Sequence, residues 1–513
     1  MVIKIKALSL IGLEGYAVDV EVDLYSGLPA FYIIGLPDKS LQEAVHRVKS
    51  AIKNSGFKFP QGKIVVNLSP ANLLKSGTGF DFAIALGILA VSKQITHDFS
   101  RNVFWGELSL DGSAKFIKGT LAAACVARDL GFENIVIPEL NATEAGIVAG
   151  INIKIVKDLK QLAKNDSYGI IPQIDFNKLV LKQKFPPIGT INFSQIKGQY
   201  YAKRALEIAA AGGHNLIMSG PPGSGKTMLS QAFCSILPPL GWEEALVVSK
   251  IYSIAGLLNE KQKIIIERPF RAPHHTASKI SLVGGGSNLK PGEITLAHHG
   301  VLFLDEMNEF ASDTLEALRQ PLENKTITVV RISGNVLYPA DFILLAAVNP
   351  CRCGYYLDSS HNCTCSARDI EHYRQKISGP ILDRMDLLVY VKSMPKELFE
   401  TQINNSLHKE LYDSVHIQNR VRQCRETQKK RSLKLYNQTL LNSHLSQTQI
   451  FATTPFTPSI KKIIRLALDK YNLSTRGIIR VLRVARTIAD LAGNSEILEK
   501  HLLEALGFRI IDF

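Results

Sequence analysis

A glycine-rich stretch, Asn215 to Ser230, limits the fold of this chain more than any other part of its sequence. It reads N-L-I-M-S-G-P-P-G-S-G-K-T-M-L-S. The apolar run 216–218 is followed by a glycine-rich turn, after which Lys226 and Thr227 begin a helical pattern. The spacing matches G-x-x-x-x-G-K-[ST], a P-loop whose backbone N–H groups surround a phosphate chain at a helix N-terminus. The sequence therefore predicts an α/β fold with a strand, loop and helix that bind ATP.

The nucleotide-binding residues expected from this motif are those of the loop and of the first helical turn. They are Gly220, Pro221, Pro222, Gly223, Ser224, Gly225, Lys226 and Thr227. Lys226 is expected to reach the β- and γ-phosphates, and the Thr227 hydroxyl to hold Mg²⁺. The alternative is a Gly/Pro loop with a chance lysine, but the flanking strand and helix favour the P-loop.

An acidic pair supplies the other groups that a nucleotide hydrolase needs. Val301 to Leu304 form an apolar run that indicates a buried parallel strand, and Asp305 and Glu306 follow at its carboxyl end. Asp305 is expected to hold Mg²⁺ through water, and Glu306 to orient and polarise the attacking water. The alternative is an exposed acidic pair that ends a strand. With the P-loop, the pair predicts a Mg²⁺-dependent ATP hydrolase.

Composition narrows the class of protein and its surroundings. At 513 residues, two or three domains are expected. Lys and Arg number 60 against 46 Asp and Glu, a net charge of +14, which favours a polyanionic partner and also suits an ordinary basic surface. The N-terminus alternates like a strand, and no apolar run is long enough for a membrane span. Four of seven cysteines lie within 351–365, a pattern typical of the reducing cytoplasm.

The pattern of the chain changes along its length and predicts four segments. Residues 1–165 mix alternating strands with amphipathic helices, and residues 166–192 are irregular and proline-containing, which indicates a linker. Residues 193–395 hold the P-loop and the acidic strand. Residues 396–513 are helical and basic, and indicate a helical lid domain.

The first segment resembles the proteolytic domain of Lon, an α+β fold with a Ser-Lys dyad. The resemblance rests on S-P-A-N-L-L-K-S-G-T-G-F-D at 69–81 and G-E-L-S-L-D-G at 106–112. It places Gly79 at the nucleophile position, beside Thr78, and matches Lys118 to the lysine. Without a hydroxyl no acyl-enzyme can form, so we expect a non-proteolytic relative. Thr78 or Ser76 as a substitute nucleophile is the alternative, and an exposed lysine is the favoured reading of Lys118.

The rest of the chain resembles the Mg-chelatase-like (YifB/ComM) AAA+ family, whose layout also includes the Lon-like segment. The runs that carry the resemblance are F-S-Q-I-K-G-Q-Y-Y-A-K-R-A-L-E-I-A-A-A-G-G-H-N-L at 193–216, R-P-F-R-A-P-H-H-T at 268–276, L-V-G-G-G-S at 282–287, P-G-E-I-T-L-A-H-H-G at 291–300 and V-L-R-V-A-R-T-I-A-D-L at 481–491. One departure is Met307-Asn308, where the family is expected to have Leu-Pro; it lies outside the catalytic pair.

The resemblance implies an AAA+ core of the helix-2-insert/pre-sensor-1 hairpin clade, a C-terminal helical lid and assembly into a ring, a hexamer. It implies a DNA partner, branched or single-stranded, and helicase-type branch migration of recombination intermediates in natural transformation. Two other functions compete. A metal-chelatase motor subunit would act on a protein partner, and a Lon-like ATP-dependent protease is disfavoured by Gly79.

The resemblance also implies roles for three residues near the nucleotide. Asn349 follows the apolar strand 342–348 and is expected to sense the γ-phosphate. Arg384, within I-S-G-P-I-L-D-R-M-D at 377–386, is expected to act as an arginine finger on the neighbouring subunit. A surface pair with Asp386 is the alternative. Arg476 is expected to be sensor 2, with Arg483 as the second choice.

Four basic residues are candidate DNA contacts. Lys261 and Lys263 lie in the insertion that the clade places in the ring's pore, and Lys325 and Arg331 lie in a predicted hairpin of strands 323–330 and 335–337. The alternative is a structural hairpin with solvated charges. The histidine pairs 274/275 and 298/299 are not expected to bind metal, because adjacent side chains point apart.

Cys351, Cys353, Cys363 and Cys365 form two C-x-C pairs directly after Asn349. Four thiolates are a tetrahedral zinc set, although the usual C-x-x-C knuckle is absent. The sequence leaves zinc and reduced structural thiols as equal alternatives.

Overall fold

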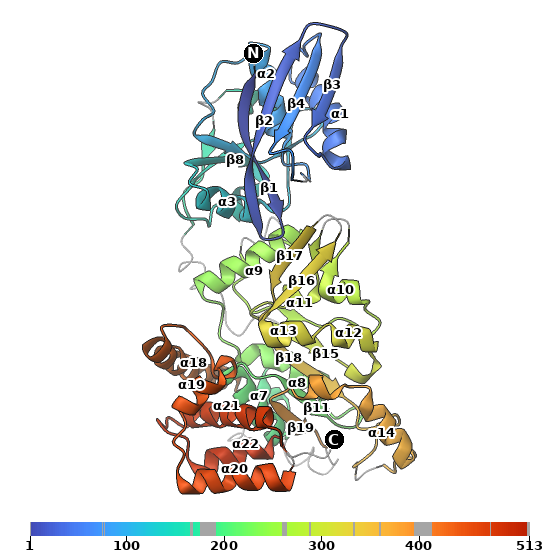
Figure 1. The fold of residues 1–513 in the computed structure, drawn as a ribbon, viewed down its shortest axis with the longest axis vertical. Helices are drawn as coiled ribbons and strands as arrows, with labels where there is room; N and C mark the ends of the chain where they lie inside the picture. Colours follow the sequence, from blue (N-terminus) through green and yellow to red (C-terminus); the bar gives the residue numbers. More distant parts are fainter. Residues whose placement is uncertain are drawn as a thin grey trace.

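The structure is a computed structural model, and it describes residues 2–73, 75, 77–164, 168–174, 191–258, 264–286, 289–331, 334–358, 361–393, 413–471 and 473–509. It has three parts: an N-terminal domain and a P-loop domain follow one another along the longest axis, and a group of C-terminal helices lies beside the lower part of the P-loop domain (Figure 1).

The N-terminal domain is built on an eight-stranded mixed sheet of order β10-β9-β8-β5-β1-β2-β4-β3. Its strands are β1 (Ile3–Ile11), β2 (Glu14–Tyr25), β3 (Ala30–Ile34), β4 (Lys63–Ser69), β5 (Asn102–Phe104), β8 (Asn134–Pro138), β9 (Asn152–Val156) and β10 (Gly169–Ile170). Val18, Val20 and Val22 of β2 are all fully buried. Because alternate side chains of a strand point to the same side, one face of β2 packs into the core. Because β10 pairs with β9, the sheet continues past residue 165 into the predicted linker.

Helices cover this sheet, and two short strands form a separate hairpin. They are α1 (Lys39–Asn54), α2 (Asp81–Val91), α3 (Thr120–Asp129), α4 (Ala142–Ala145), α5 (Leu159–Leu162), β6 (Glu107–Leu108) and β7 (Ala114–Lys115). Helix α2 is apolar along almost its whole length and is buried all round, because it packs on both β1 and β2.

The P-loop domain contains a five-stranded parallel sheet of order β12-β15-β18-β11-β19. Its strands are β11 (Leu216–Ser219), β12 (Phe270–Arg271), β15 (Val301–Leu304), β18 (Ile343–Val348) and β19 (Leu387–Tyr390). Leu216 is in register with Leu345 on one side and Leu387 on the other. The carboxyl ends of the strands lie at one edge, where α/β sheets bind ligands. The predicted parallel α/β sheet is confirmed.

Helices surround this sheet on both faces, which explains why its strands are continuously apolar. They are α7 (Tyr200–Gly212), α8 (Lys226–Phe233), α9 (Trp242–Ala255), α10 (Lys279–Val283), α11 (Glu293–Leu296), α12 (Ser312–Glu316), α13 (Arg319–Asn324), α14 (Ala367–Gln375) and α15 (Gly379–Leu382), with a small ribbon of β13 (Gly284–Gly285) and β14 (Lys290–Pro291).

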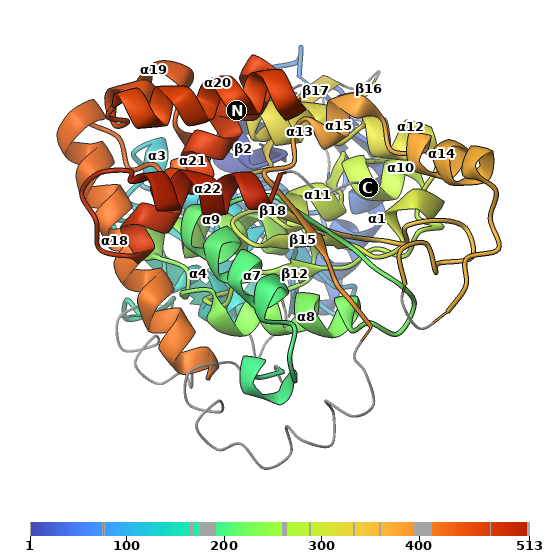
Figure 2. The ribbon, with the colours of Figure 1, turned by 90° about the horizontal axis from the view of Figure 1, so that it is seen from below.

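The C-terminal part is helical, as predicted. Its helices are α18 (Ser414–Tyr436), α19 (Gln447–Ala452), α20 (Pro458–Tyr471), α21 (Thr475–Leu491) and α22 (Glu499–Gly507). They share one hydrophobic cluster with α7 and the sheet, so they pack directly beside the P-loop domain (Figure 2). Ser474 caps α21 by accepting a hydrogen bond from the Gly477 N–H.

A hairpin of β16 (Thr326–Arg331) and β17 (Gly334–Pro339) stands between α13 and β18, as predicted. Its two faces differ. Val329 and Val336 are buried, whereas Val330 and Leu337 are 64% and 62% exposed. The hairpin therefore has one face in the core and one apolar face in contact with solvent.

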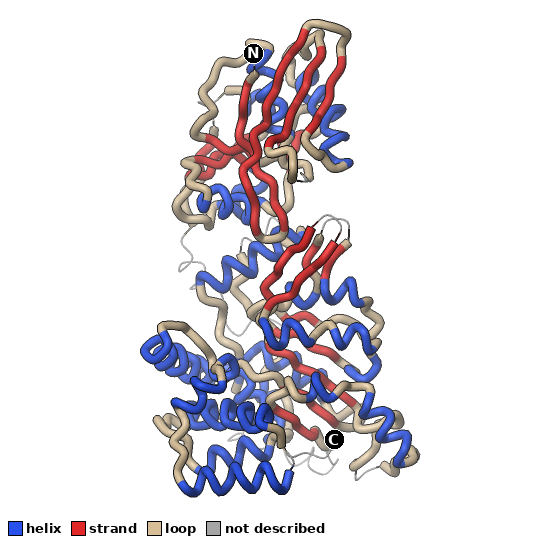
Figure 3. Tube along the Cα trace, in the orientation of Figure 1, coloured by secondary structure: helices blue, strands red, loops and turns tan. Residues whose placement is uncertain are grey.

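The N-terminal domain contacts the P-loop domain at two places, and at one of them the strands of both parts approach one another (Figure 3). The β1–β2 turn lies on the hairpin: a Cβ built at Gly12 would be 2.3 Å from Cγ1 of Val336. The Gly119 N–H donates to the carbonyl of Ser253 at 3.2 Å. Side chains of α3 share a hydrophobic cluster with α9, so the interface is apolar as well as hydrogen-bonded.

Among the described residues, no helix is both long and apolar enough to cross a membrane.

Candidate nucleotide site

The P-loop connects β11 to α8. Its glycines are required for different structural reasons. Gly223 and Gly225 have φ values of 75° and 91°, and a Cβ built at either would meet nothing within 4 Å. They therefore supply the left-handed backbone and face open space. At Gly220 a Cβ would be 2.3 Å from the Val391 carbonyl oxygen, so close packing requires glycine there.

Lys226, the first residue of α8, lies inside the loop. Its Nζ donates to the carbonyls of Gly220 at 2.7 Å and Pro221 at 2.9 Å, and to Oδ1 of Asn349 at 3.3 Å. Burial lowers the pKa of the Lys226 ammonium to about 8, against the opposing effect of the nearby carboxylates Asp305 and Glu306. The structure thus brings the predicted phosphate lysine and the predicted γ-phosphate sensor into contact.

Thr227 and the acidic pair lie on the other side of the loop. The Thr227 hydroxyl donates to Oδ2 of Asp305 at 2.8 Å, which joins the start of α8 to the end of β15. Glu306 follows with φ at 50°, a left-handed backbone that is uncommon outside glycine and that turns the chain sharply after Asp305. Its Oε2 lies 3.7 Å from Nδ1 of His275.

These residues line one cavity of about 420 Å³, bordered by residues 222–228, the acidic pair and residues 347–349. The donor set suits magnesium and a triphosphate, because a hydroxyl and a carboxylate oxygen meet beside a lysine and an open ring of backbone N–H groups. Mg²⁺ held by Thr227 and Asp305 would neutralise charge on the phosphates.

Arg384 and Arg476 lie outside this cavity. They line a second cavity of about 310 Å³ together with Arg480 and Arg483, and the two cavities have no lining residue in common. Arg384 is ion-paired with Glu323 and donates to the Pro380 carbonyl at 2.8 Å. In the part of the chain that the structure describes, the Nε atoms of Arg384 and Arg483 are buried without a hydrogen-bond partner. The second cavity is therefore lined by four guanidinium groups.

Asp386 organises the floor of the second cavity. It is 4% exposed and accepts from Arg480 at 2.7 Å and from the backbone N–H of Asn215 at 3.1 Å. Burial opposes ionisation, but Arg480 and the neighbouring His214 outweigh it and hold the pKa of Asp386 far below its usual value. The ion pair fixes the arginine-bearing segment to the start of the P-loop strand.

The candidate DNA contacts are placed only in part. Lys325, at the base of the hairpin, lies 3.3 Å from Oδ1 of Asp341. Lys261, Lys263 and the side chain of Arg331 lie outside the described residues.

Among the described residues, only Cys351, Cys353, Cys363 and Cys365 form a group of three or more His, Cys, Asp or Glu side chains that could hold a metal ion. The histidine pairs are not part of such a group among the described residues, although the rings of each pair lie close together, with centroids 4.1 Å apart at 274/275 and 3.9 Å apart at 298/299. The contact of His275 with Glu306 was missed, because the sequence pattern gave no signal for it beyond the adjacent histidines.

The fold and the site are those of a P-loop ATPase, and three family profiles identify its type. "Magnesium chelatase, subunit ChlI" matches residues 192–399, "Subunit ChlI of Mg-chelatase" matches residues 20–141, and "Magnesium chelatase, subunit ChlI C-terminal" matches residues 412–509. The chain belongs to the Mg-chelatase-like AAA+ family, in the group that contains ComM and YifB.

Relatives match over nearly the full length. The chain is 39% identical over 507 residues to competence protein ComM of Haemophilus influenzae, covering 97% of this chain and 95% of the relative. It is 37% identical over 508 residues to YifB of Escherichia coli, covering 98% and 96%. A more distant match, 22% identical over 252 residues, is the magnesium-chelatase 38 kDa subunit of Cereibacter sphaeroides, covering 46% and 66%.

The pKa of Lys226 predicts how ATP affinity depends on pH. Phosphate binding favours the ammonium form, so above a pKa of about 8 the free protein must take up a proton to bind ATP. Affinity is expected to be constant below pH 8 and to fall by up to about tenfold per pH unit above it. Fluorescence titration with a non-hydrolysable ATP analogue measures this. Lys226→Arg, which stays charged, is the control, and a flat wild-type profile to pH 10 would contradict the assignment.

Proposed function

We propose that this protein is a Mg²⁺-dependent ATPase that assembles into a ring, a hexamer, and remodels branched or single-stranded DNA in the cytoplasm. Its task would be helicase-type branch migration of recombination intermediates during natural transformation. The observation that carries the proposal is the division of the catalytic groups: the phosphate, metal and water-positioning residues converge in one cavity, and the arginines lie in another.

In the first cavity each residue has a distinct task. Lys226 and the loop N–H groups hold the triphosphate, and Thr227 and Asp305 hold the metal. Glu306 follows directly after Asp305, where its carboxylate can orient water, and Asn349 touches the lysine from the end of β18. Hydrolysis of this kind depends mainly on positioning and charge stabilisation.

The second cavity supports ring assembly. Arg384 and Arg476 line a cavity that is separate from the P-loop cavity of their own chain. In a ring they would face the nucleotide of the neighbouring subunit, where their guanidinium groups would bind phosphate oxygens.

A mixing experiment tests this arrangement. Arg384→Ala and Lys226→Ala are each expected to be inactive ATPases. A 1:1 mixture, after subunit exchange, should regain roughly a quarter of wild-type turnover, because about one interface in four joins an intact P-loop to an intact arginine. No recovery in mixed rings, verified by pull-down of differently tagged subunits, would contradict action across the interface.

DNA as substrate is supported by the net charge of +14 and by the relationship to a protein named competence protein. We further propose the helix-2-insert/pre-sensor-1 hairpin clade, with β16 and β17 as its hairpin. Contacts from Lys261, Lys263, Lys325 and Arg331 to DNA, and the divisions at residues 192 and 395, remain part of this proposal, whereas the pairing of β10 with β9 places the end of the first segment later than residue 165.

A protease function is disfavoured by the N-terminal domain, for which we propose a non-proteolytic Lon-like fold. A Cβ at Gly79 would be 2.6 Å from Cζ3 of Trp105, so no nucleophile fits at that position. The Thr78 hydroxyl is hydrogen-bonded to Glu107. Lys118 lies against Gly256 of the P-loop domain: a Cβ built at Gly256 would be 2.9 Å from Nζ of Lys118.

A metal-chelatase motor that remodels a protein partner is the second candidate, favoured by the chelatase relative. A fluorescent four-way junction separates the two. ATP-dependent strand exchange, together with faster ATP turnover on junction DNA than without DNA, supports the DNA function. An ATP turnover that DNA does not change, together with no strand exchange, would overturn the DNA function and leave the chelatase-type motor as the remaining candidate.

A further inference from the structure

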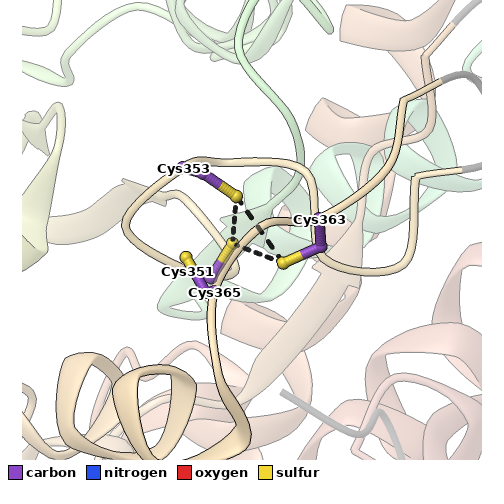
Figure 4. A group of neighbouring side chains, drawn as sticks. All are labelled: Cys351, Cys353, Cys363 and Cys365. Atoms are coloured by element: carbon purple, nitrogen blue, oxygen red, sulfur yellow. Dashed lines mark hydrogen bonds between the residues drawn. The ribbon is translucent and has the colours of Figure 1, made fainter.

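The loop between β18 and α14 brings four cysteine side chains together (Figure 4). The Cys351 and Cys353 sulfurs are 3.3 Å apart, and Cys363 lies 3.7 Å from Cys351 and 3.6 Å from Cys353. With Cys365 included, all four sulfurs lie within 4.8 Å of one another, and none is in a disulfide.

This spacing matches one tetrahedral metal ion. Sulfurs about 2.3 Å from a central zinc lie about 3.8 Å from each other, which is close to the separations observed here. Thiolates select zinc and other soft ions over magnesium or calcium. Reduced structural thiols, the other alternative from the sequence, give no reason for four sulfurs from two separate C-x-C pairs to converge on one point.

The backbone forms a tight turn at the first C-x-C pair. The Gly354 N–H donates to the Cys351 carbonyl at 3.0 Å, and Gly354 has a left-handed φ of 87°. Within this turn the Cys351 and Cys353 sulfurs lie 3.3 Å apart.

We propose that Cys351, Cys353, Cys363 and Cys365 bind one structural Zn²⁺ ion, and that this ion positions Asn349 and the P-loop for ATP hydrolysis. Zinc binding stands on the cysteine geometry alone. The positioning effect rests on the proposed ATPase function.

The cluster is physically joined to the nucleotide cavity. Cys351 is fully buried and follows Asn349 by two residues at the end of β18. Gly354 lies against the P-loop, since a Cβ there would be 2.6 Å from Cδ of Pro222. A metal that fixes Cys351 therefore holds both the sensor side chain and one wall of the phosphate loop.

The loop also needs the ion for its own order. Residues 350–358 and 361–366 contain no helix or strand, and three of the four cysteines are only partly buried. Its contacts with the rest of the domain include the Ser393 hydroxyl donating to Asp358 at 2.7 Å and the Arg374 guanidinium 4.9 Å from the Tyr356 ring centroid. Metal binding supplies folding free energy where a small apolar core cannot.

Metal analysis of the purified full-length chain tests the binding. The wild type is expected to carry about one zinc per chain, and the Cys363→Ser/Cys365→Ser double variant less than about a tenth of that. Cys234→Ala, a cysteine outside the cluster, should keep the full zinc content. A wild type without zinc, stoichiometric iron or copper in its place, or a double variant that retains zinc, would each overturn the proposal.

A second measurement does not depend on the folding of a variant. Titration of the wild type with a mercurial thiol reagent, in the presence of a metal-indicator dye, should release one zinc as the cluster thiols react. Full modification of the thiols without zinc release would overturn the site.

The positioning effect is tested by steady-state ATPase assays and equilibrium ATP binding. The zinc-free double variant is expected to have a kcat about tenfold or more below that of the wild type, and a Kd for ATP that differs by less than about threefold. Cys234→Ala should match the wild type. If the wild type hydrolyses ATP and the zinc-free variant is as fast, the positioning role is wrong. If the wild type carries zinc but has no ATPase activity, the proposed function fails and the zinc site stands.

Discussion

Replacement of Glu306 by glutamine is expected to lower ATP turnover by about a hundredfold or more while ATP still binds. The amide keeps the size of the side chain but loses the carboxylate that would polarise water. In the proposed function Lys226, Thr227 and Asp305 would hold the phosphates and the metal without Glu306, since none of their hydrogen bonds involves its side chain.

Steady-state phosphate release and equilibrium binding of fluorescent ATP measure the two effects separately. Glu309→Gln is the matched control, because it makes the same change three residues later on an exposed side chain outside the nucleotide cavity. Turnover of Glu306→Gln within about threefold of the wild type would exclude Glu306 as the residue that activates water.

Replacement of Asp386 by alanine is expected to destabilise the P-loop domain by about 3–5 kcal/mol, the usual effect of breaking a buried ion pair. The change leaves Arg480 and the Asn215 N–H without their acceptor in the interior. Urea unfolding followed by circular dichroism measures the loss. Asp383→Ala, which removes a half-exposed carboxylate from the same cavity, is expected to cost less than about 1 kcal/mol.

The effect of Asp386 has a defined pH dependence. Its pKa in the folded protein lies far below the ordinary value of 3.8, so its carboxylate contributes its full stability above about pH 4 and loses it as the pH falls further. The stability gap between wild type and Asp386→Ala should therefore be constant from pH 5 to 8 and shrink in acid. A gap that widens below pH 4 would contradict the ion-pair explanation.

The parts of the fold that the sequence predicts well are those with strong local patterns. Val301–Leu304 is a strand with the predicted bounds, because four apolar residues are enclosed by Gly300 and Asp305. The P-loop lies between β11 and α8 because its glycines can adopt backbone angles that other residues avoid. The meeting of Lys226, Thr227 and Asp305 follows from the rule that ligands bind at the carboxyl ends of parallel strands.

Other features could not be predicted because their causes lie in tertiary structure. The edge strand β12 is two residues long, too short for any periodic pattern. The sequence from 311 to 320 is typical of one helix, but the structure has two shorter helices there, α12 and α13. The separation of Arg384 from the P-loop of its own chain depends on how β19 and α21 pack, which no local pattern records. The spacing of the cysteines also did not reveal that all four sulfurs meet.

The contact of the N-terminal domain with the hairpin of β16 and β17 affects how the hairpin can move. Gly12 and the partly buried Leu13 lie against the side chains of β16 and β17, while the α3–α9 contact holds the same domain at a second point. If the hairpin moved without the N-terminal domain, these apolar surfaces would separate and become exposed to water, which is unfavourable. Movement of the hairpin together with the N-terminal domain would keep these surfaces buried and would therefore cost less free energy.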